Sequence, residues 1–159
     1  MREHEAFSRK EGKQREFQIY MFGRGGGLKE DLKRNDLLYP TGLVHKGCLE
    51  KKISFENILA DNNGIQGANY NVGTVINQTV EELQKATKKG DAVSVDMECF
   101  SLWLAAQNAL LNYNEAIKNI DIGIALYVSD LPLKGDTLAE ELDSDKGEKA
   151  AVKQILKNI

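Results

Sequence analysis

Residues 91–97 (DAVSVDM) and residues 120–128 (IDIGIALYV) decide the fold, because both stretches are rich in Val, Ile and other strand-forming residues. An acidic side chain follows each stretch. Glu98 stands between the first strand and a helix-patterned run, and Asp130 lies just beyond the second strand. If the two strands lie in one parallel sheet, both carboxylates emerge at its carboxyl edge, where open α/β sheets bind ligands. One carboxylate would then bind hydroxyls, and the other would move a proton.

Each carboxylate also has a purely structural interpretation. Asp and Glu after a strand are common as turn formers and as helix N-terminal caps, where they interact favourably with the helix dipole. For Glu98 or Asp130 taken alone, the structural and the functional interpretations are equally open. The distinction therefore depends on the sequence around them.

Two further strands are predicted in the first third of the chain. Residues 17–22 (FQIYMF) form a strand that runs into a glycine loop at residues 25–27. Residues 37–44 (LLYPTGLV) form another strand, in which Pro40 requires an edge or bulge position because proline lacks an N–H donor.

The remainder of the chain alternates between strand and helix patterns. Residues 61–67 (DNNGIQG) have the composition of a loop, and residues 70–76 (YNVGTVI) resume the strand pattern. Thr79 begins a capping-box spacing that opens a helix, which Gly90 closes. Two later helices each have one apolar stripe. The first stripe comprises Cys99, Leu102, Trp103, Ala106, Ala109 and Leu110, and the second, after a capping-box spacing at residues 137–140, comprises Val152, Ile155, Leu156 and Ile159.

This alternation predicts an α/β fold, with a mostly parallel or mixed central sheet flanked by helices. The length of 159 residues fits one domain with a sizeable core. Residues 1–16 mix both charge signs with few apolar side chains and are expected to form a polar N-terminal arm. Residues 17–159 are then the α/β domain.

Composition narrows the class of partner. The formal net charge of −3 argues against a nucleic-acid polymer, whose binders usually have a basic face. The sequence has no apolar run long enough for a membrane span and no signal-peptide core, so we expect a cytoplasmic protein without a membrane partner. The spacing of Cys48 and Cys99 fits neither a disulfide framework nor a zinc motif, so both are expected to be reduced thiols, and no metal is expected.

Three motifs resemble the signatures of one enzyme superfamily. Residues 23–28 (GRGGGL) with residues 31–40 (DLKRNDLLYP) are similar to the GTxGGL and LKxGDLxxP signatures of the nucleoside phosphorylase and nucleosidase superfamily. Asn35 takes the place of the usual glycine, and both residues tolerate a left-handed turn conformation. Residues 95–99 (VDMEC) and 128–130 (VSD) resemble the later signatures, in the same order. The resemblance extends from about residue 17 to about residue 136.

This resemblance implies a protein that cleaves the N-glycosidic bond of a purine nucleoside or nucleotide. Such cleavage builds positive charge on the ribose and sends electrons into the departing base, so the reaction needs an acid near the base and a carboxylate near the sugar. By resemblance, Asp130 is the acid, acting at N7 of the purine. Glu98 binds the ribose hydroxyls and Met97 packs on the sugar, while Ser129 and Ile76 lie on the base side.

By the same resemblance, Gly23, Arg24, Gly25 and Gly26 form an anion loop. Phosphate is a possible co-substrate there, and no other cofactor is expected. The family usually has Ser or Thr at the position of Arg24, so phosphate and water both remain open as the nucleophile. Arginine could clamp a phosphate, fill the pocket or pair with an acidic neighbour. Residues 129–135 (SDLPLKG) also look somewhat like AMP nucleosidases, with Lys134 either a partner for a 5′-phosphate or a solvated loop lysine.

Members of the superfamily are longer than this chain, so the resemblance implies a phosphorylase-like sheet without its N-terminal strands and with an exposed edge. Three possibilities are open. In the first, the protein is an active nucleosidase or phosphorylase, completed by another chain or by a homo-oligomer. In the second, it is a truncated, catalytically inactive nucleoside-binding or assembly module. In the third, it has an unrelated α/β fold that places Glu98 and Asp130 at opposite edges of the sheet.

Overall fold

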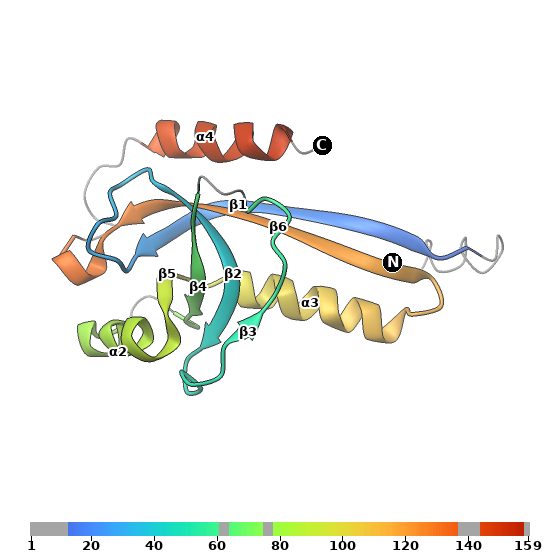
Figure 1. The fold of residues 1–159 in the computed structure, drawn as a ribbon, viewed down its shortest axis with the longest axis horizontal. Coiled ribbons are helices and arrows are strands. Elements are labelled where there is room, and N and C mark those ends of the chain that lie inside the picture. The colour runs from blue at the N-terminus through green and yellow to red at the C-terminus, as the bar shows by residue number, and fades with distance from the viewer. Residues whose placement is uncertain (1–12, 61–63, 75–77, 137–143, 158–159) are drawn as a thin grey trace.

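The computed structural model describes residues 13–60, 64–74, 78–136 and 144–157. Its longest feature is a parallel ribbon of two strands, β1 (Arg15–Gly27) and β6 (Ile117–Asp130), which Figure 1 shows running through the length of the molecule. The predicted strands at residues 17–22 and 120–128 are therefore both present and longer than expected. Of the predicted polar arm, residues 1–12 lie outside the described part of the chain, so this boundary stays a prediction.

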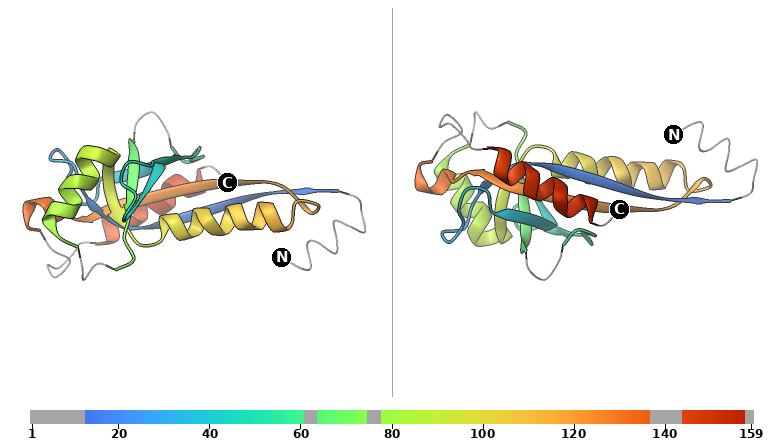
Figure 2. Two further views of the ribbon diagram at one scale, coloured as in Figure 1. Left: turned by 90° about the horizontal axis from the view of Figure 1, so that it is seen from below. Right: turned by 90° about the horizontal axis from the view of Figure 1, so that it is seen from above.

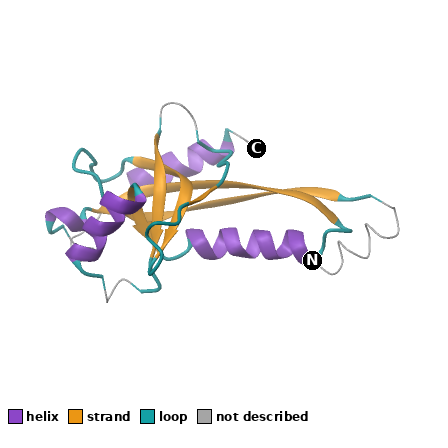
Figure 3. Ribbon diagram, turned by 60° about the horizontal axis from the view of Figure 1, so that its bottom comes forward, coloured by secondary structure: helices purple, strands orange, loops and turns teal. Residues whose placement is uncertain are grey.

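Four more strands complete a mixed sheet. They are β2 (Leu37–His45), β3 (Ile53–Ser54), β4 (Ile65–Asn71) and β5 (Ala92–Asp96), and the order is β3-β2-β4-β5-β1-β6. Strands β2, β4 and β5 are parallel to one another, whereas β1 is antiparallel to β5. An additional antiparallel pairing joins β2 to β6, so five of the strands close into a ring. Figure 3 shows these shorter strands gathered around one end of the ribbon.

Helices cover both sides of the ribbon, which confirms the α/β class. Helix α3 (Cys99–Asn112) lies along one side and α4 (Ser144–Leu156) along the other, as Figures 1 and 2 show. Helix α2 (Val80–Gly90) packs beside β5, and a short 3-10 turn, η1 (Pro132–Lys134), follows β6. The main core lies between α3 and the sheet and includes all six residues of the predicted α3 stripe. Within the described residues, no helix is long and apolar enough to cross a membrane.

The predicted glycine loop at residues 25–27 is wrong, because these glycines are the last residues of β1. Gly26 is paired with Val95 of β5 on one side and with Asp130 of β6 on the other. A Cβ on Gly26 would lie 2.9 Å from a methyl of Val95, and one on Gly27 would lie 3.0 Å from Leu131. The glycines are therefore needed for the close approach of three strands and not for a turn.

The predicted loop at residues 61–67 and strand at residues 70–76 are also misplaced where the structure describes them, because β4 occupies Ile65–Asn71. Residues 61–63, 75 and 76 lie outside the described part of the chain. Gly67 lies inside β4, where a Cβ would be only 2.3 Å from Val93 Cγ1. Asn69 is fully buried and donates from Nδ2 to Ser94 Oγ at 2.9 Å. Glycine and asparagine are typical loop residues, but here the glycine permits close packing and the asparagine forms a hydrogen bond inside the sheet. This difference explains why the sequence predicted a loop where the structure has a strand.

Pro40 lies at a β-bulge, as predicted. The register between β2 and β4 shifts between Pro40 and Gly42. The side chain of buried Asn57 fills the gap in the ladder, donating from Nδ2 to the carbonyl oxygens of Pro40 at 2.9 Å and Ile124 at 2.8 Å. Its Oδ1 accepts the Ile124 N–H at 2.9 Å, so one amide ties the bulge to β6.

The predicted cap of α2 is confirmed, with Thr79 Oγ1 accepting the Glu82 N–H at 3.2 Å. Gly90 does not take the left-handed position that ends the helix; Asp91 does, with φ 51°. Gly90 is instead the last helical residue, where a Cβ would lie 3.0 Å from both methyls of Val44. The constraint on Gly90 is helix-to-sheet packing.

Helix α4 differs from its predicted stripe. Val152 is half-buried, but the Leu156 side chain is 68% exposed. Close contact with the sheet is instead made at Gly147, where a Cβ would lie 2.7 Å from the Tyr127 ring. The predicted cap at residues 137–140 and Ile159 lie outside the described residues.

Asp96, the last residue of β5, provides the cap of α3. Its Oδ2 accepts the Cys99 N–H at 3.1 Å, and the side chain is buried with 6% exposure. Burial raises the pKa of Asp96 from 3.8 to about 6, against the lowering effect of its hydrogen bonds with Cys99. Ionisation of Asp96 therefore destabilises the folded protein.

We expect the Asp96→Asn variant to be more stable than the wild type at pH 8. Since the pKa of Asp96 is higher in the folded than in the unfolded chain, its contribution to stability is complete below pH 3.8 and lost as pH rises through about 6. The full loss is about 3 kcal/mol. An asparagine still accepts the Cys99 N–H but carries no charge. Urea unfolding at pH 4 and pH 8 measures the difference.

The matched control is Asp31→Asn, at an exposed position, which should change stability little at either pH. An Asp96→Asn protein that is less stable than the wild type at pH 8 would show that the charged cap outweighs the cost of burial.

Candidate active site

A cavity of about 860 Å³ opens where β1, β5 and β6 meet. Glu98 and Asp130 both line it, as do Met97 and Ser129. The predicted convergence of the two carboxylates on one hollow is therefore present. The remaining lining comes from residues 21–26 of β1, the start of α2 and the turn after β6, and includes Gln78, Val80, Pro132 and Asp136.

The carboxylates converge by a different route from the one predicted. Strands β5 and β6 do not share a carboxyl edge, because β1 lies between them, antiparallel to β5 and parallel to β6. The two strands thus run in opposite directions and end on either side of Gly26, which pairs with Val95 and with Asp130. The absence of a side chain on Gly26 lets Val95 and Pro132 approach this residue, since a Cβ there would lie 2.9 Å from a Val95 methyl and 3.3 Å from Pro132 Cγ.

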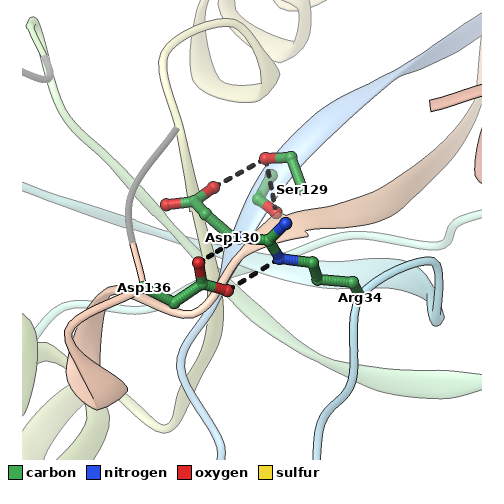
Figure 4. Close-up of polar contacts among 5 residues, drawn as sticks. Arg34, Ser129, Asp130 and Asp136 are labelled. Carbon is green, nitrogen blue, oxygen red and sulfur yellow. Dashed lines mark hydrogen bonds and ion pairs between the residues drawn. The ribbon is translucent and has the colours of Figure 1, made fainter. Parts of the chain in front are cut away.

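Asp130 is a buried acid at the end of β6, with 9% exposure. The Ser129 hydroxyl donates to Asp130 Oδ1 at 2.6 Å, while the Gly25 carbonyl oxygen lies 3.5 Å from the same hydroxyl (Figure 4). Burial raises the pKa of Asp130, and the negative charge of Asp136 raises it further. The Ser129 hydrogen bond and the positive charge of Arg34 act in the lowering direction. Asp130 can therefore hold a proton more readily than an exposed aspartate.

An ion pair supports the turn beside Asp130. Arg34 binds Asp136 with two nitrogens, Nε at 2.8 Å from Oδ2 and Nη2 at Oδ1 (Figure 4). Lys134 Nζ donates to the Leu32 carbonyl oxygen at 3.0 Å, so the turn after β6 is tied twice to the segment before β2. These ties hold the residues that follow Asp130 in place.

Glu98 is exposed and is the N-cap residue of α3 by position, but its side chain makes no capping hydrogen bond. The cap bond comes from Asp96 instead. Within the described chain, Glu98 Oε2 accepts a hydrogen bond only from its neighbour's amide, the Met97 N–H at 3.3 Å. Glu98 therefore takes the N-cap position without capping the helix through a side-chain hydrogen bond, and its carboxylate is available at the cavity. Met97 beside it is 40% exposed.

The predicted anion loop is a strand edge. Gly23, Arg24, Gly25 and Gly26 all line the cavity, but they belong to β1 and pair along β6. Arg24 is exposed, and no acidic side chain within the described residues pairs with it. Of the three alternatives for this arginine, pairing with an acidic neighbour finds no support in that part of the chain.

Three other residues considered from sequence lie elsewhere. Ile76, expected on the base side, falls outside the described residues. Lys134 lines a separate hollow beside α2, away from the two carboxylates. Cys99 is fully buried against the sheet, and burial raises the pKa of its thiol, so it is a packing residue. Both cysteines are free thiols.

Sequence reasoning did not identify several residues of the cavity. Phe22, Val80 and Gln78 line it from β1 and from the start of α2, and Asp136 lines it from the turn after β6. Phe22 and Val80 carried a signal, since each is a large apolar side chain next to a motif. Gln78 carried none, because nothing in the sequence distinguishes it from a surface glutamine. In the described residues, no group of three or more His, Cys, Asp or Glu side chains could hold a metal ion.

Comparison with known proteins gives a fold. No protein-family model and no curated protein sequence matches the chain. Among solved structures, the chain is similar to the methylthioadenosine/S-adenosylhomocysteine nucleosidase of Campylobacter jejuni, with a TM-score of 0.65 and 18% identity over 98% of this chain and 72% of that one. The corresponding nucleosidase of Helicobacter pylori is similar with a TM-score of 0.62 and 18% identity, over 99% of this chain and 74% of that one.

A purine nucleoside phosphorylase from Toxoplasma gondii in complex with immucillin-H gives a TM-score of 0.54 and 19% identity, over 87% of this chain and 61% of that one. The chain thus spans 61% to 74% of the length of these three structures. It has the α/β fold of nucleoside phosphorylases and nucleosidases, over the part of that fold which it spans.

Proposed function

We propose that this chain binds a purine nucleoside in the cavity between β1, β5 and β6 and cleaves its N-glycosidic bond. One observation carries the proposal: two carboxylates with opposite environments line one hollow, Asp130 buried with a raised pKa and Glu98 exposed without a cap bond. Such a pair is suited to one proton donor and one charged ligand. The likeness to a phosphorylase in complex with immucillin-H and to two nucleosidases supports the choice of a nucleoside.

Asp130 is the general acid. As the bond between C1′ and N9 breaks, its electrons flow into the purine, and a proton from Asp130 at N7 neutralises the charge that develops there. The raised pKa keeps a share of Asp130 protonated for this step. Ser129 holds the carboxylate through its hydrogen bond at 2.6 Å, so it is a positioning residue.

Glu98 is the ribose ligand. A carboxylate that accepts hydrogen bonds from the sugar hydroxyls fixes the ribose and stabilises the positive charge that grows on the ring. The exposed Met97 side chain packs against the sugar face.

Water is the nucleophile that the lining favours. Arg24 is the one cationic side chain among the described residues that line the cavity, and Glu98, Asp130 and Asp136 are the acidic ones. The carboxylate of Glu98 would repel a divalent phosphate there, and Asp136 is already paired with Arg34, so Arg24 would be the single cation available to hold the anion, whereas water needs none. Phosphate held by Arg24 and the backbone of Gly23, Gly25 and Gly26 is the competing arrangement, and a phosphate requirement would establish it.

The apolar part of the lining favours an uncharged nucleoside over a nucleotide. Phe22, Val80 and Met97 are three of the six large apolar side chains that are exposed in the described residues, and all three line this cavity. Their apolar surface suits the faces of a base and a sugar. The alternative partner for a 5′-phosphate, Lys134, lies in another hollow.

A catalytically inactive nucleoside-binding or assembly module is the second candidate. It is favoured by residues 21–25 of β1, which pair with β6 and with no other described strand. A strand edge of this kind is a surface on which a second copy or another chain can add a strand. In that case nucleoside binding persists without turnover.

A substrate panel tests the proposal. The purified chain is incubated with inosine, adenosine, methylthioadenosine and AMP, with and without phosphate, and base release is followed by chromatography. We expect release from the uncharged nucleosides without a phosphate requirement. Asp130→Asn should lower kcat by roughly 100-fold or more with little change in nucleoside affinity, because the acid contributes mainly in the transition state. Binding without release from any substrate would favour the inactive module, and neither binding nor release would end the proposal.

The pH profile tests the role of Ser129. Its hydrogen bond lowers the pKa of Asp130, so in Ser129→Ala that pKa should rise further. An acid with a higher pKa stays protonated to higher pH, so the alkaline limb of kcat/KM should move upward. The control is Ser101→Ala, an equal change at an exposed position of α3. A limb that stays in place in both variants would separate Ser129 from the acid.

A further inference from the structure

Gln78 has a buried donor without a partner. Its Nε2 is shielded from solvent and has no hydrogen-bond partner within the described residues. Leaving such a group unpaired costs about 1–3 kcal/mol, so its presence needs an explanation. The other unpaired side-chain atoms of this kind lie on β4, on residues that do not line the cavity, whereas Gln78 does line it. A ligand in the cavity is the available source of an acceptor.

The position of Gln78 is fixed by the helix that follows it. Thr79 is the N-cap of α2, with its Oγ1 bonded to the Glu82 N–H at 3.2 Å. Leu83 is 2% exposed and anchors the first turn of α2 in the core. A side chain that precedes such an anchored turn presents its amide from a defined backbone position.

We propose that Gln78 recognises position 6 of the purine, donating from Nε2 to a carbonyl oxygen there, so that the preferred substrates are 6-oxopurine nucleosides. This inference rests on the proposed function, because it places the base in the same cavity. It names the class of base that the cavity selects.

The chemistry of the purine edge connects Gln78 to Asp130. A 6-oxopurine has two adjacent acceptors on one edge, N7 and O6, whereas a 6-aminopurine has the acceptor N7 beside an amino donor. The two donors that the cavity offers, the proton of Asp130 and the amide of Gln78, therefore match the 6-oxo edge. With the amide oriented as it is here, so that Nε2 is the unpaired atom, an amino group in that place would meet a second donor and leave Nε2 without a bond.

The expected discrimination is substantial. A site that hydrogen-bonds a substrate group rejects an analogue that lacks it, because the buried partner in the site is then left without a bond. One neutral hydrogen bond lost in this way corresponds to a preference of roughly 10- to 100-fold in kcat/KM.

The test compares kcat/KM for inosine and adenosine in the wild type, Gln78→Met and Gln78→Glu. The wild type should prefer inosine. Gln78→Met keeps the length of the side chain without the donor, so it should lose most of the inosine preference through a lower value for inosine. Gln78→Glu presents only acceptors at neutral pH, so it should shift the ratio toward adenosine. The matched control, Gln84→Met, makes the same change at an exposed position of α2 and should leave the ratio unchanged.

Stability provides a second readout. Since Gln78 Nε2 has no partner in the described structure, Gln78→Met should unfold at the same temperature as the wild type or higher. A structural glutamine would instead lower that temperature when it is replaced.

The outcomes separate the two proposals. If nucleosides are cleaved but the wild type does not prefer inosine, or Gln78→Met keeps the wild-type ratio, the assignment of Gln78 is wrong and the proposed function stands. If nucleosides bind without turnover, the ratio of dissociation constants from calorimetry replaces the ratio of kcat/KM and decides the assignment of Gln78 in the same way. If no nucleoside binds, the proposed function and the assignment fall together.

Discussion

The close approach of three strands at Gly26 is the constraint on which the site depends. Strands β5 and β6 run in opposite directions and end on either side of this one residue of β1. Their carboxyl ends approach one another this closely because β1 carries no side chain there, since a Cβ would lie 2.9 Å from a Val95 methyl and 3.3 Å from Pro132 Cγ. The glycine cluster thus acts through packing, and the cavity with its two carboxylates follows from it.

Three acidic side chains near this junction have different tasks because their surroundings differ. Asp96 is buried and caps α3, which leaves the carboxylate of Glu98 without a structural hydrogen bond to the helix. Asp130 is buried at the cavity and bonded to Ser129, with Asp136 and Arg34 acting on its charge in opposite directions. Division of labour between carboxylates in one site depends on such differences in environment. A cavity lined by a buried acid and an exposed carboxylate can therefore donate a proton and bind hydroxyls at the same pH.

The sequence predicted the class of fold, the strand β6 and helix α3, because these depend on local periodicity. It also predicted that Glu98 and Asp130 line one hollow, but from a parallel arrangement of β5 and β6 that the structure does not have. It did not predict β4 or the role of Gly25, Gly26 and Gly27. Gly67 and Asn69 resemble loop residues in composition, and only the positions of Val93 and Ser94 on the neighbouring strand show why they occupy a strand. Direction in the sheet was also beyond the sequence, since the antiparallel contact of β1 with β5 involves only two paired residues. Gln78 became a candidate only when its burial and missing partner were known.

The closed ring of strands explains how a chain that spans 61% to 74% of its structural neighbours can hold Glu98 and Asp130 at one cavity. Strands β2, β4, β5, β1 and β6 pair in succession, and the pairing of β2 with β6 returns to the start. The buried amide of Asn57 reinforces that closure by bonding to Pro40 of β2 and to Ile124 of β6. Each strand that carries a site residue is therefore held by a neighbour within the described chain. At the junction itself, Gly26 pairs on both sides, with Val95 of β5 and with Asp130 of β6, so the arrangement of Glu98 and Asp130 does not require a further strand to define it.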